Sequence, residues 1–207
     1  VRNGVMVGRT LFYGQTDGFL YRRSFDGVNF GVATQVNPYI DPLWSTVETG
    51  SGPVGQTYKG VLPAWYAALP TVTGMFYANG RIYYTKSGSN SLFWRWFSPD
   101  SGIIAGIENT VTGGDIAWSA TKGMFIDGST LYVVSSTNGQ LLKIPFVNGA
   151  PSGTSSVANA TVDWRGRAVF LSSVLPNAAP TAAFTSRCTG TSCSFDASGP
   201  TATAATV

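Results

Sequence analysis

Residues 74–102 read GMFYANGRIYYTKSGSNSLFWRWFSPDSG, and this stretch decides the fold because other parts of the chain repeat its order of features. It opens with Gly-Met-Phe, continues through a small turn that ends in glycine, and enters a β-rich run at Ile82. A polar turn then leads to a second run that begins at Leu92. Alternating bulky and polar residues, broken by such turns, are typical of short antiparallel strands.

Two other segments follow the same order. Residues 123–146 read GMFIDGSTLYVVSSTNGQLLKIPF. Residues 4–25 read GVMVGRTLFYGQTDGFLYRRSF, which is one residue shorter in each turn. The equivalent positions are Leu11, Ile82 and Leu131, then Leu20, Leu92 and Leu141, then Phe25, Phe97 and Phe146. The sequence therefore predicts three copies of one structural unit.

The spacing of the units indicates the architecture. Ile82 and Leu131 are 49 residues apart, and repeats of about forty to fifty residues with four short antiparallel strands are typical of β-propeller blades. We therefore predict an all-β protein with its blades within residues 1–173. The expected blades are residues 4–36, 74–112 and 123–160, with a partial fourth at 162–172. A β-sandwich is the alternative fold.

Three blades and part of another are not expected to close a ring, because the end blades would expose apolar faces and strand edges. Three solutions stay open. The chain belongs to a longer propeller, other chains supply the missing blades, or residues 37–73 plug the gap. Among these we expect further blades from a second copy or a companion chain.

The composition narrows the classes of function. Histidine is absent, which excludes Ser-His-Asp and Cys-His nucleophiles, His-ligated zinc and a histidine general base. The net charge of +3 is spread over scattered Lys and Arg residues, without the basic stripe of a nucleic-acid-binding protein. The sequence has no apolar run long enough for a membrane span. We expect no cofactor, no metal and no nucleic-acid partner.

Residues 37–73 form an excursion between the first two units. Leu11 and Ile82 are 71 residues apart, which is longer than one period, and long excursions from a rigid scaffold are often functional. The aromatic residues that we expect to contact a ligand are Tyr39, Trp44, Tyr58, Trp65 and Tyr66. The alternative is that these side chains cover a blade edge or fill a gap between blades.

Candidates for catalysis are few. A glycosidase needs two carboxyl groups at a set separation, and Asp41 with Glu48 is the only pair that we consider. Residues 24–30 and 98–102 resemble the Asp box of sialidase-like propellers, whose Asp, Ser and Gly close a turn. The arginines that a sialidase would require recur at outer-strand positions, namely Arg22, Arg23 and Arg95.

Trp94 and Trp96 are two residues apart and therefore face the same side of a strand. They form either a core layer between blades, which we favour, or an exposed platform for a sugar ring. Trp65-Tyr66 is the better platform, because Pro63 and Pro70 bracket it in a surface loop or short helical turn.

The C-terminal region differs from the repeats. Residues 174–179 form a linker, and the chain from Asn177, within that linker, to Gly199 reads NAAPTAAFTSRCTGTSCSFDASG. These residues resemble the opening of the polycystic kidney disease (PKD) type of immunoglobulin-like β-sandwich domain. The family's Asp-rich turn and Trp-Asp-Phe-Gly-Asp-Gly strand do not follow, so the resemblance implies an incomplete PKD-like segment at 180–207. For Cys188 and Cys193 we expect a local disulfide, which indicates an oxidising, exported setting.

A propeller followed by such a segment resembles secreted bacterial proteins in which these modules accompany enzymes that act on polysaccharides or surface proteins. We therefore predict a secreted, extracellular and non-catalytic recognition module that binds a glycan or a protein surface. The alternatives are a polysaccharide hydrolase or lyase that uses Asp41 and Glu48, and a structural scaffold or spacer.

Overall fold

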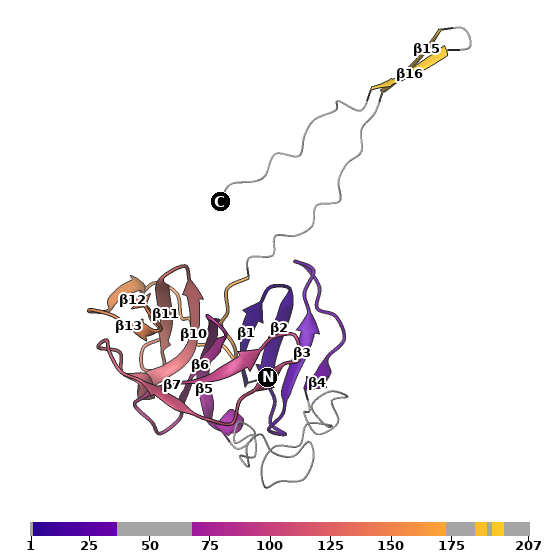
Figure 1. Ribbon diagram of the computed structural model, residues 1–207. Helices are drawn as coiled ribbons and strands as arrows, with labels where there is room; N and C mark the ends of the chain where they lie inside the picture. The colour runs from indigo at the N-terminus through magenta and orange to yellow at the C-terminus, as the bar shows by residue number, and fades with distance from the viewer. Residues whose placement is uncertain (1, 37–67, 173–184, 190–191, 197–207) are drawn as a thin grey trace, which may run out of the picture. The chain divides into compact units, whose positions relative to one another are not determined.

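A computed structural model of the protein describes residues 2–36, 68–172, 185–189 and 192–196. Strands dominate the described backbone, and the all-β class predicted from the sequence is confirmed. The chain forms two compact units, Val1–Leu175 and Pro176–Val207. The described part of the first unit contains three antiparallel sheets (Figure 1).

In each sheet the strands follow one another in chain order. The first sheet comprises β1 (Arg2–Val7), β2 (Thr10–Gly14), β3 (Leu20–Ser24) and β4 (Thr34–Val36). The second comprises β5 (Val72–Ala78), β6 (Arg81–Lys86), β7 (Leu92–Ser98), β8 (Ile103–Ile104) and β9 (Asn109–Val111). The third comprises β10 (Thr121–Asp127), β11 (Thr130–Ser135), β12 (Leu141–Val147), β13 (Ala150–Pro151) and β14 (Ser156–Asn159). Short 3-10 turns precede two first strands, η2 (Leu69–Thr71) before β5 and η3 (Trp118–Ala120) before β10.

The strand register confirms the repeat. The first set of equivalent residues lies on the second strand of each sheet, where the cross-strand pairs are Met6–Leu11, Tyr77–Ile82 and Ile126–Leu131. The second set begins the third strands, where the pairs are Leu20–Val36, Leu92–Val111 and Leu141–Asn159. The second and third sheets have five strands rather than four, because β7 pairs with both β8 and β9, and β12 with both β13 and β14.

Each first strand carries a β-bulge near its beginning. The bulges skip Asn3, Thr73 and Lys122 in the pairing with the second strand. The first hairpin of every sheet has a loop of two residues. The residue that the first unit lacks is therefore missing from β1, and the prediction that placed this gap in the first turn is wrong.

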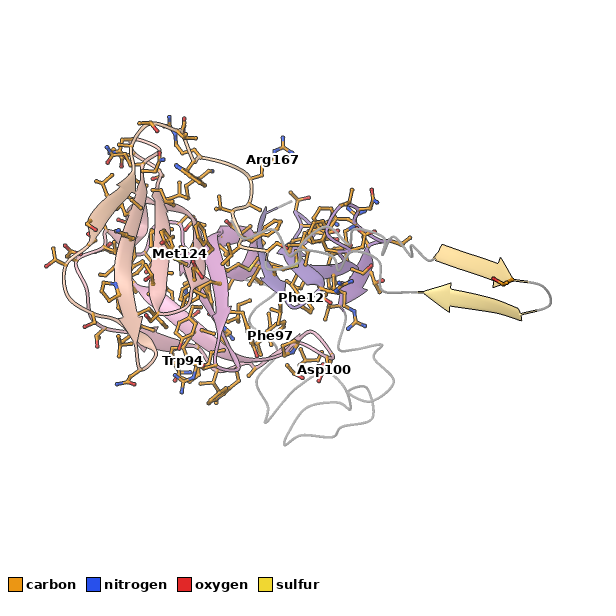
Figure 2. The ribbon with its side chains drawn as sticks, turned by 90° about the horizontal axis from the view of Figure 1, so that it is seen from above. Phe12, Trp94, Phe97, Asp100, Met124 and Arg167 are labelled. Carbon is orange, nitrogen blue, oxygen red and sulfur yellow. The ribbon has the colours of Figure 1, made fainter. Side chains whose placement is uncertain are left out.

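Two apolar clusters fill the spaces between neighbouring sheets. Between the first and second sheets, Phe97 meets Phe12 edge-to-face with ring centroids 5.0 Å apart (Figure 2). Between the second and third sheets, Phe146 meets Phe76 and Tyr83 in the same manner, at 5.2 Å from each. Equivalent phenylalanines thus pack against the preceding sheet in both places.

Phe76 and Phe125 occupy equivalent positions in their sheets and make equivalent stacking contacts. Phe76 stacks on Tyr83 with ring centroids 4.8 Å apart, and Phe125 stacks on Tyr132 at 4.7 Å. Phe76 is buried, whereas Phe125 and Tyr132 are half-buried. Such recurring cross-strand pairs, one sheet after another, favour repeated propeller-like sheets over a β-sandwich, in which two sheets share one core.

The first strands of the three sheets lie side by side, with β5 between β1 and β10. Their approach is close, because a Cβ atom on Gly74 would lie only 3.0 Å from Met124 Cγ and 3.1 Å from Thr121 Cγ2. Glycine at this position therefore allows the strands to meet.

Residues 166–169 complete a ring with these three strands. The Asn3 amide donates to the Arg167 carbonyl at 3.0 Å, and a Cβ atom on Gly123 would lie 3.1 Å from Val169 Cγ2. No strand is assigned over the described residues 160–172. The segment at 162–172, expected as a partial fourth blade, therefore contains no assigned strand. It bridges the third sheet and the first instead.

The described part of the second unit is a single hairpin. β15 (Thr185–Thr189) pairs with β16 (Ser192–Asp196), and the register sets Cys188 directly opposite Cys193. Residues opposite one another in an antiparallel pair are about 4.5–5.5 Å apart between Cα atoms, which is compatible with a disulfide. The disulfide and the PKD-like character of this segment stay predictions.

Candidate functional site

The predicted ligand contacts and the predicted catalytic pair all lie outside the residues that the structure describes. They are Tyr39, Trp44, Tyr58, Trp65 and Tyr66, together with Asp41 and Glu48. The described sheets nevertheless contain polar and aromatic clusters, which include Trp94, Trp96 and Arg95 from the sequence analysis together with residues that it did not consider. Two of these clusters involve the second sheet.

A partly buried ionic network joins β6 and β7 to the loop before β9. The Tyr84 hydroxyl donates to Glu108 Oε2 at 2.6 Å, and Arg95 Nε donates to the Tyr84 oxygen at 2.7 Å. Lys86 Nζ lies 2.8 Å from Glu108 Oε1. Arg95 Nη1 also donates to the carbonyls of Ala105 and Gly106, at 3.2 and 2.5 Å. The guanidinium thus holds the backbone that separates β8 from β9.

The protonation of this network is set by its surroundings. Burial raises the pKa of Tyr84, and the hydrogen bond to Glu108 raises it further. Burial opposes ionisation of Glu108, but the hydrogen bonds from Lys86 and Tyr84 outweigh it, so the pKa of Glu108 is lowered. A tyrosine next to a glutamate is the pair that a sialidase needs, yet Tyr84 is fully buried and Arg95 is 3% exposed. The network therefore stabilises the second sheet, and its tyrosine hydroxyl is closed to a substrate.

The first turn motif, residues 24–30, has the structural role expected of an Asp box. Asp26 Oδ1 accepts hydrogen bonds from the backbone amides of Val28 and Asn29 at 2.8 and 2.6 Å. The bond from Asn29 and then that from Val28 lower the pKa of Asp26. Of the nearby arginines, Arg22 donates to the Asp100 carbonyl and Arg23 to the Gly31 carbonyl, so each holds a backbone group.

The second cluster is an aromatic group at the outer part of the second sheet. The Arg81 guanidinium carbon lies 4.1 Å from the ring centroid of Trp94 and 4.7 Å from that of Trp96. The two indoles meet edge-to-face with centroids 5.3 Å apart. Trp94 is half-buried and Trp96 is 53% exposed. We call Arg81, Trp94 and Trp96 the Arg–Trp cluster.

The core layer that we favoured for these two tryptophans is therefore only partly correct. Trp94 packs against the cluster between the second and third sheets, but Trp96 extends beyond it into solvent. Strand parity placed both side chains on one face, and only the extent of the neighbouring third sheet decides how much of that face is covered. The sequence pattern therefore could not predict that Trp96 is exposed while Trp94 is half-buried.

The repeat shows that the scaffold does not require the Arg–Trp cluster. The register pairs Arg81 with Trp96, Thr10 with Ser24 and Thr130 with Pro145. The first and third sheets thus have small or polar residues where the second has arginine and tryptophan. Ser24 and Pro145 occupy the equivalent positions in the other two sheets. A tryptophan is therefore not needed at this position to form the sheet.

Comparisons with known proteins show similarity only to solved structures. No family model matches the chain, and no curated protein does. A hemopexin fold protein, CP4 from cow pea, is 10% identical with a TM-score of 0.45 and covers 82% of this chain and 76% of its own. Glutaminyl cyclase from Myxococcus xanthus is 14% identical with a TM-score of 0.39 and covers 74% of this chain.

PorZ, a surface component of the type-IX secretion system of Porphyromonas gingivalis, is 12% identical with a TM-score of 0.34 and covers 78% of this chain. This chain spans half the length of the glutaminyl cyclase and 28% of PorZ.

Within the described ranges, no helix has the length and apolarity needed to cross a membrane. The same ranges contain no group of three or more acidic, Cys or His side chains arranged for a metal ion.

Proposed function

We propose that the protein is a non-catalytic extracellular recognition module that binds a glycan through the Arg–Trp cluster. In this proposal the three sheets are three propeller blades, and residues 166–169 take the place of a fourth inner strand. The observation that carries the proposal is the 53% exposure of Trp96, at a position where the other two sheets have serine and proline.

The chemistry of the cluster suits a sugar. An exposed indole offers a flat apolar surface on which the C–H face of a sugar ring can stack, while the guanidinium offers hydrogen-bond donors to hydroxyl groups. Arg81 is held in place by two tryptophan rings, so little side-chain entropy would be lost on binding. Its Nε is buried and has no hydrogen-bond partner among the described residues, which favours a guanidinium held by stacking.

The extracellular setting rests on the C-terminal hairpin and on the resemblance of that region to PKD domains. Opposed cysteines in a short hairpin are typical of proteins exported to oxidising compartments.

Further blades from a second copy or a companion chain also remain part of the proposal. They would pack on the half-buried pair Phe125 and Tyr132, which is equivalent to the buried pair Phe76 and Tyr83. Sedimentation at micromolar concentration that shows only monomer would contradict this association.

A glycan array with the intact chain tests the function. Trp96→Ala should weaken binding to any glycan on the array by at least about tenfold, as for truncation of a central aromatic contact. Ile107→Ala is the matched control, because Ile107 lies between β8 and β9 of the second sheet and is 59% exposed. It should bind as the parent does.

Two results would overturn the proposal. If a glycan binds equally well to the parent and to Trp96→Ala, the Arg–Trp cluster is not the site. Loss of that binding in Trp65→Ala would then locate the site in residues 37–73. If no glycan binds, the glycan assignment is wrong, and a protein ligand becomes the stronger hypothesis.

A further inference from the structure

A basic cavity of about 640 Å³ lies where the first strands of the sheets meet the bridging segment. Each of the four sides of the ring contributes to its lining, through Asn3 from β1, Thr73 from β5, Lys122 from β10, and Arg165 and Arg167 from the bridging segment. Its volume is within the range of small-molecule sites, about 300–1,000 Å³. This cavity is separate from the Arg–Trp cluster, because none of the three cluster residues lines it.

The β-bulges explain which side chains reach the cavity. A bulge leaves one residue out of the strand pairing and changes the direction of its side chain. The residues left out are Asn3, Thr73 and Lys122, and all three line the cavity. The same backbone irregularity, repeated in three sheets, thus directs one side chain from each sheet to one place.

Two of the three bulge residues use their polar groups within the protein. Asn3 Nδ2 donates to the Val72 carbonyl at 2.6 Å, and the Thr73 hydroxyl lies 2.8 Å from that of Thr85. Lys122 differs, because it is exposed and forms no ion pair among the described residues. The third sheet therefore directs a free ammonium group to a position where the other sheets have satisfied neutral groups.

The bridging segment adds two guanidinium groups. The amide of Asn3 fixes the backbone at the Arg167 carbonyl, and the Arg167 side chain reaches out from the ribbon in Figure 2. Arg167 likewise has no ion pair among the described residues. Arg165 is paired with Asp163 at 2.7 Å, and the hydrogen bond from Arg165 holds the pKa of Asp163 at about 2. No Asp or Glu occurs among the described lining residues, so the lining as a whole is cationic.

We propose that this cavity binds a carboxylate-bearing sugar, with Lys122 and Arg167 holding the carboxylate. Two cations on neighbouring elements, β10 and the bridging segment, suit a shared anion, because a charge-assisted hydrogen bond is about twice as strong as a neutral one. The hydroxyl-bearing side chains of the lining, Thr71, Thr73 and Ser87, suit the remaining sugar hydroxyls. The choice of a sugar rests on the proposed glycan recognition, whereas the choice of an anion rests on the cavity alone.

Isothermal titration calorimetry of the intact chain with glucuronate, glucose, acetate and sulfate tests the proposal. Glucuronate should bind saturably, glucose at least about tenfold more weakly, and the affinity for glucuronate should fall as salt is added. Lys122→Gln and Arg167→Gln should each weaken glucuronate binding by about tenfold or more. Lys143→Gln removes an equally exposed lysine from the third sheet and should leave the affinity unchanged.

The possible results are distinguishable. Unchanged glucuronate binding in both cavity variants, or absence of saturable binding, overturns the site. Equal affinity for glucuronate and acetate or sulfate overturns the sugar assignment and leaves an anion site. Lys122→Arg should retain binding, which separates loss of charge from loss of fold. Glucuronate binding that survives Trp96→Ala would support this cavity even if the Arg–Trp cluster binds nothing.

Discussion

Replacing Phe146 by alanine should destabilise the protein far more than the same change at Phe25, although the repeat makes the two positions equivalent. Phe146 is 6% exposed and lies between the second and third sheets, with its ring 5.2 Å from the rings of Phe76 and Tyr83. Its removal forfeits hydrophobic burial, leaves a cavity, and breaks two edge-to-face contacts. Phe→Ala substitutions in such sites cost about 3–5 kcal/mol.

Phe25 has a different environment. It is half-buried, stacks on the exposed Phe30 with centroids 4.6 Å apart, and belongs to neither of the two clusters between sheets. Its removal forfeits one aromatic contact and part of its burial, which is about 1 kcal/mol. The expected difference between the two variants is therefore about 2–4 kcal/mol.

Urea and thermal unfolding, followed by tryptophan fluorescence and far-ultraviolet circular dichroism, measure both variants. For a unit of this size, about 1 kcal/mol corresponds to about 2–4 °C in Tm, so Phe146→Ala should melt about 6–20 °C below the parent. Phe146→Leu, which retains most of the volume, should recover most of the loss. Equal destabilisation by Phe25→Ala and Phe146→Ala would refute the reasoning. It would show that Phe25 is as deeply buried in solution as Phe146.

Further predictions concern the ionic network, the inner strands and the hairpin. Because the pKa of Glu108 is lowered from 4.5, its carboxylate stabilises the fold above that value, and this stabilisation is lost as pH falls through the folded-state pKa. Glu108→Gln should therefore lose about 1–2 kcal/mol at pH 7, and its difference from the parent in urea titrations should shrink as pH falls below 4.5; parallel pH profiles would contradict this. Gly74→Ala would bring a Cβ atom to 3.0 Å from Met124 Cγ and should cost about 1–3 kcal/mol, and an unchanged Tm would exclude so close an approach. If Cys188 and Cys193 form a disulfide, the intact mass of the protein secreted by an oxidising host should be lower than that of the reduced protein by two hydrogen atoms. Equal masses before and after reduction would refute the disulfide.

Local patterns carried the prediction of the strands. Alternation of bulky and polar residues and glycine-containing turns are properties of neighbouring residues, so Ile82 and Leu92 could be placed on paired strands from the chain alone. The repeat then transferred that assignment to Leu131 and Leu141. The location of the residue that the first unit lacks could not be predicted, because a strand or a turn can each be one residue shorter. The structure shows that it is missing from β1.

The candidate sites were harder to predict. Asn3, Thr73 and Lys122 occupy equivalent bulges, but their side chains carry different functional groups. The sequence pattern therefore does not mark them as equivalent. Asn3 and Arg167 are far apart in the sequence, so their hydrogen bond could not be predicted from it. Contacts that form because the first strands of separate units converge do not produce a periodic pattern in the sequence.

The sequence by itself determined the all-β class, the three repeated units and the pairing of the strands within each, because these follow from alternation and turn chemistry over a few residues. Only the tertiary structure decided that Trp96 is exposed while Tyr84 is buried, and that residues 166–169 bridge the third sheet and the first. Side-chain parity determines which residues share a face. Whether that face meets solvent or another sheet depends on parts of the chain that are distant in sequence.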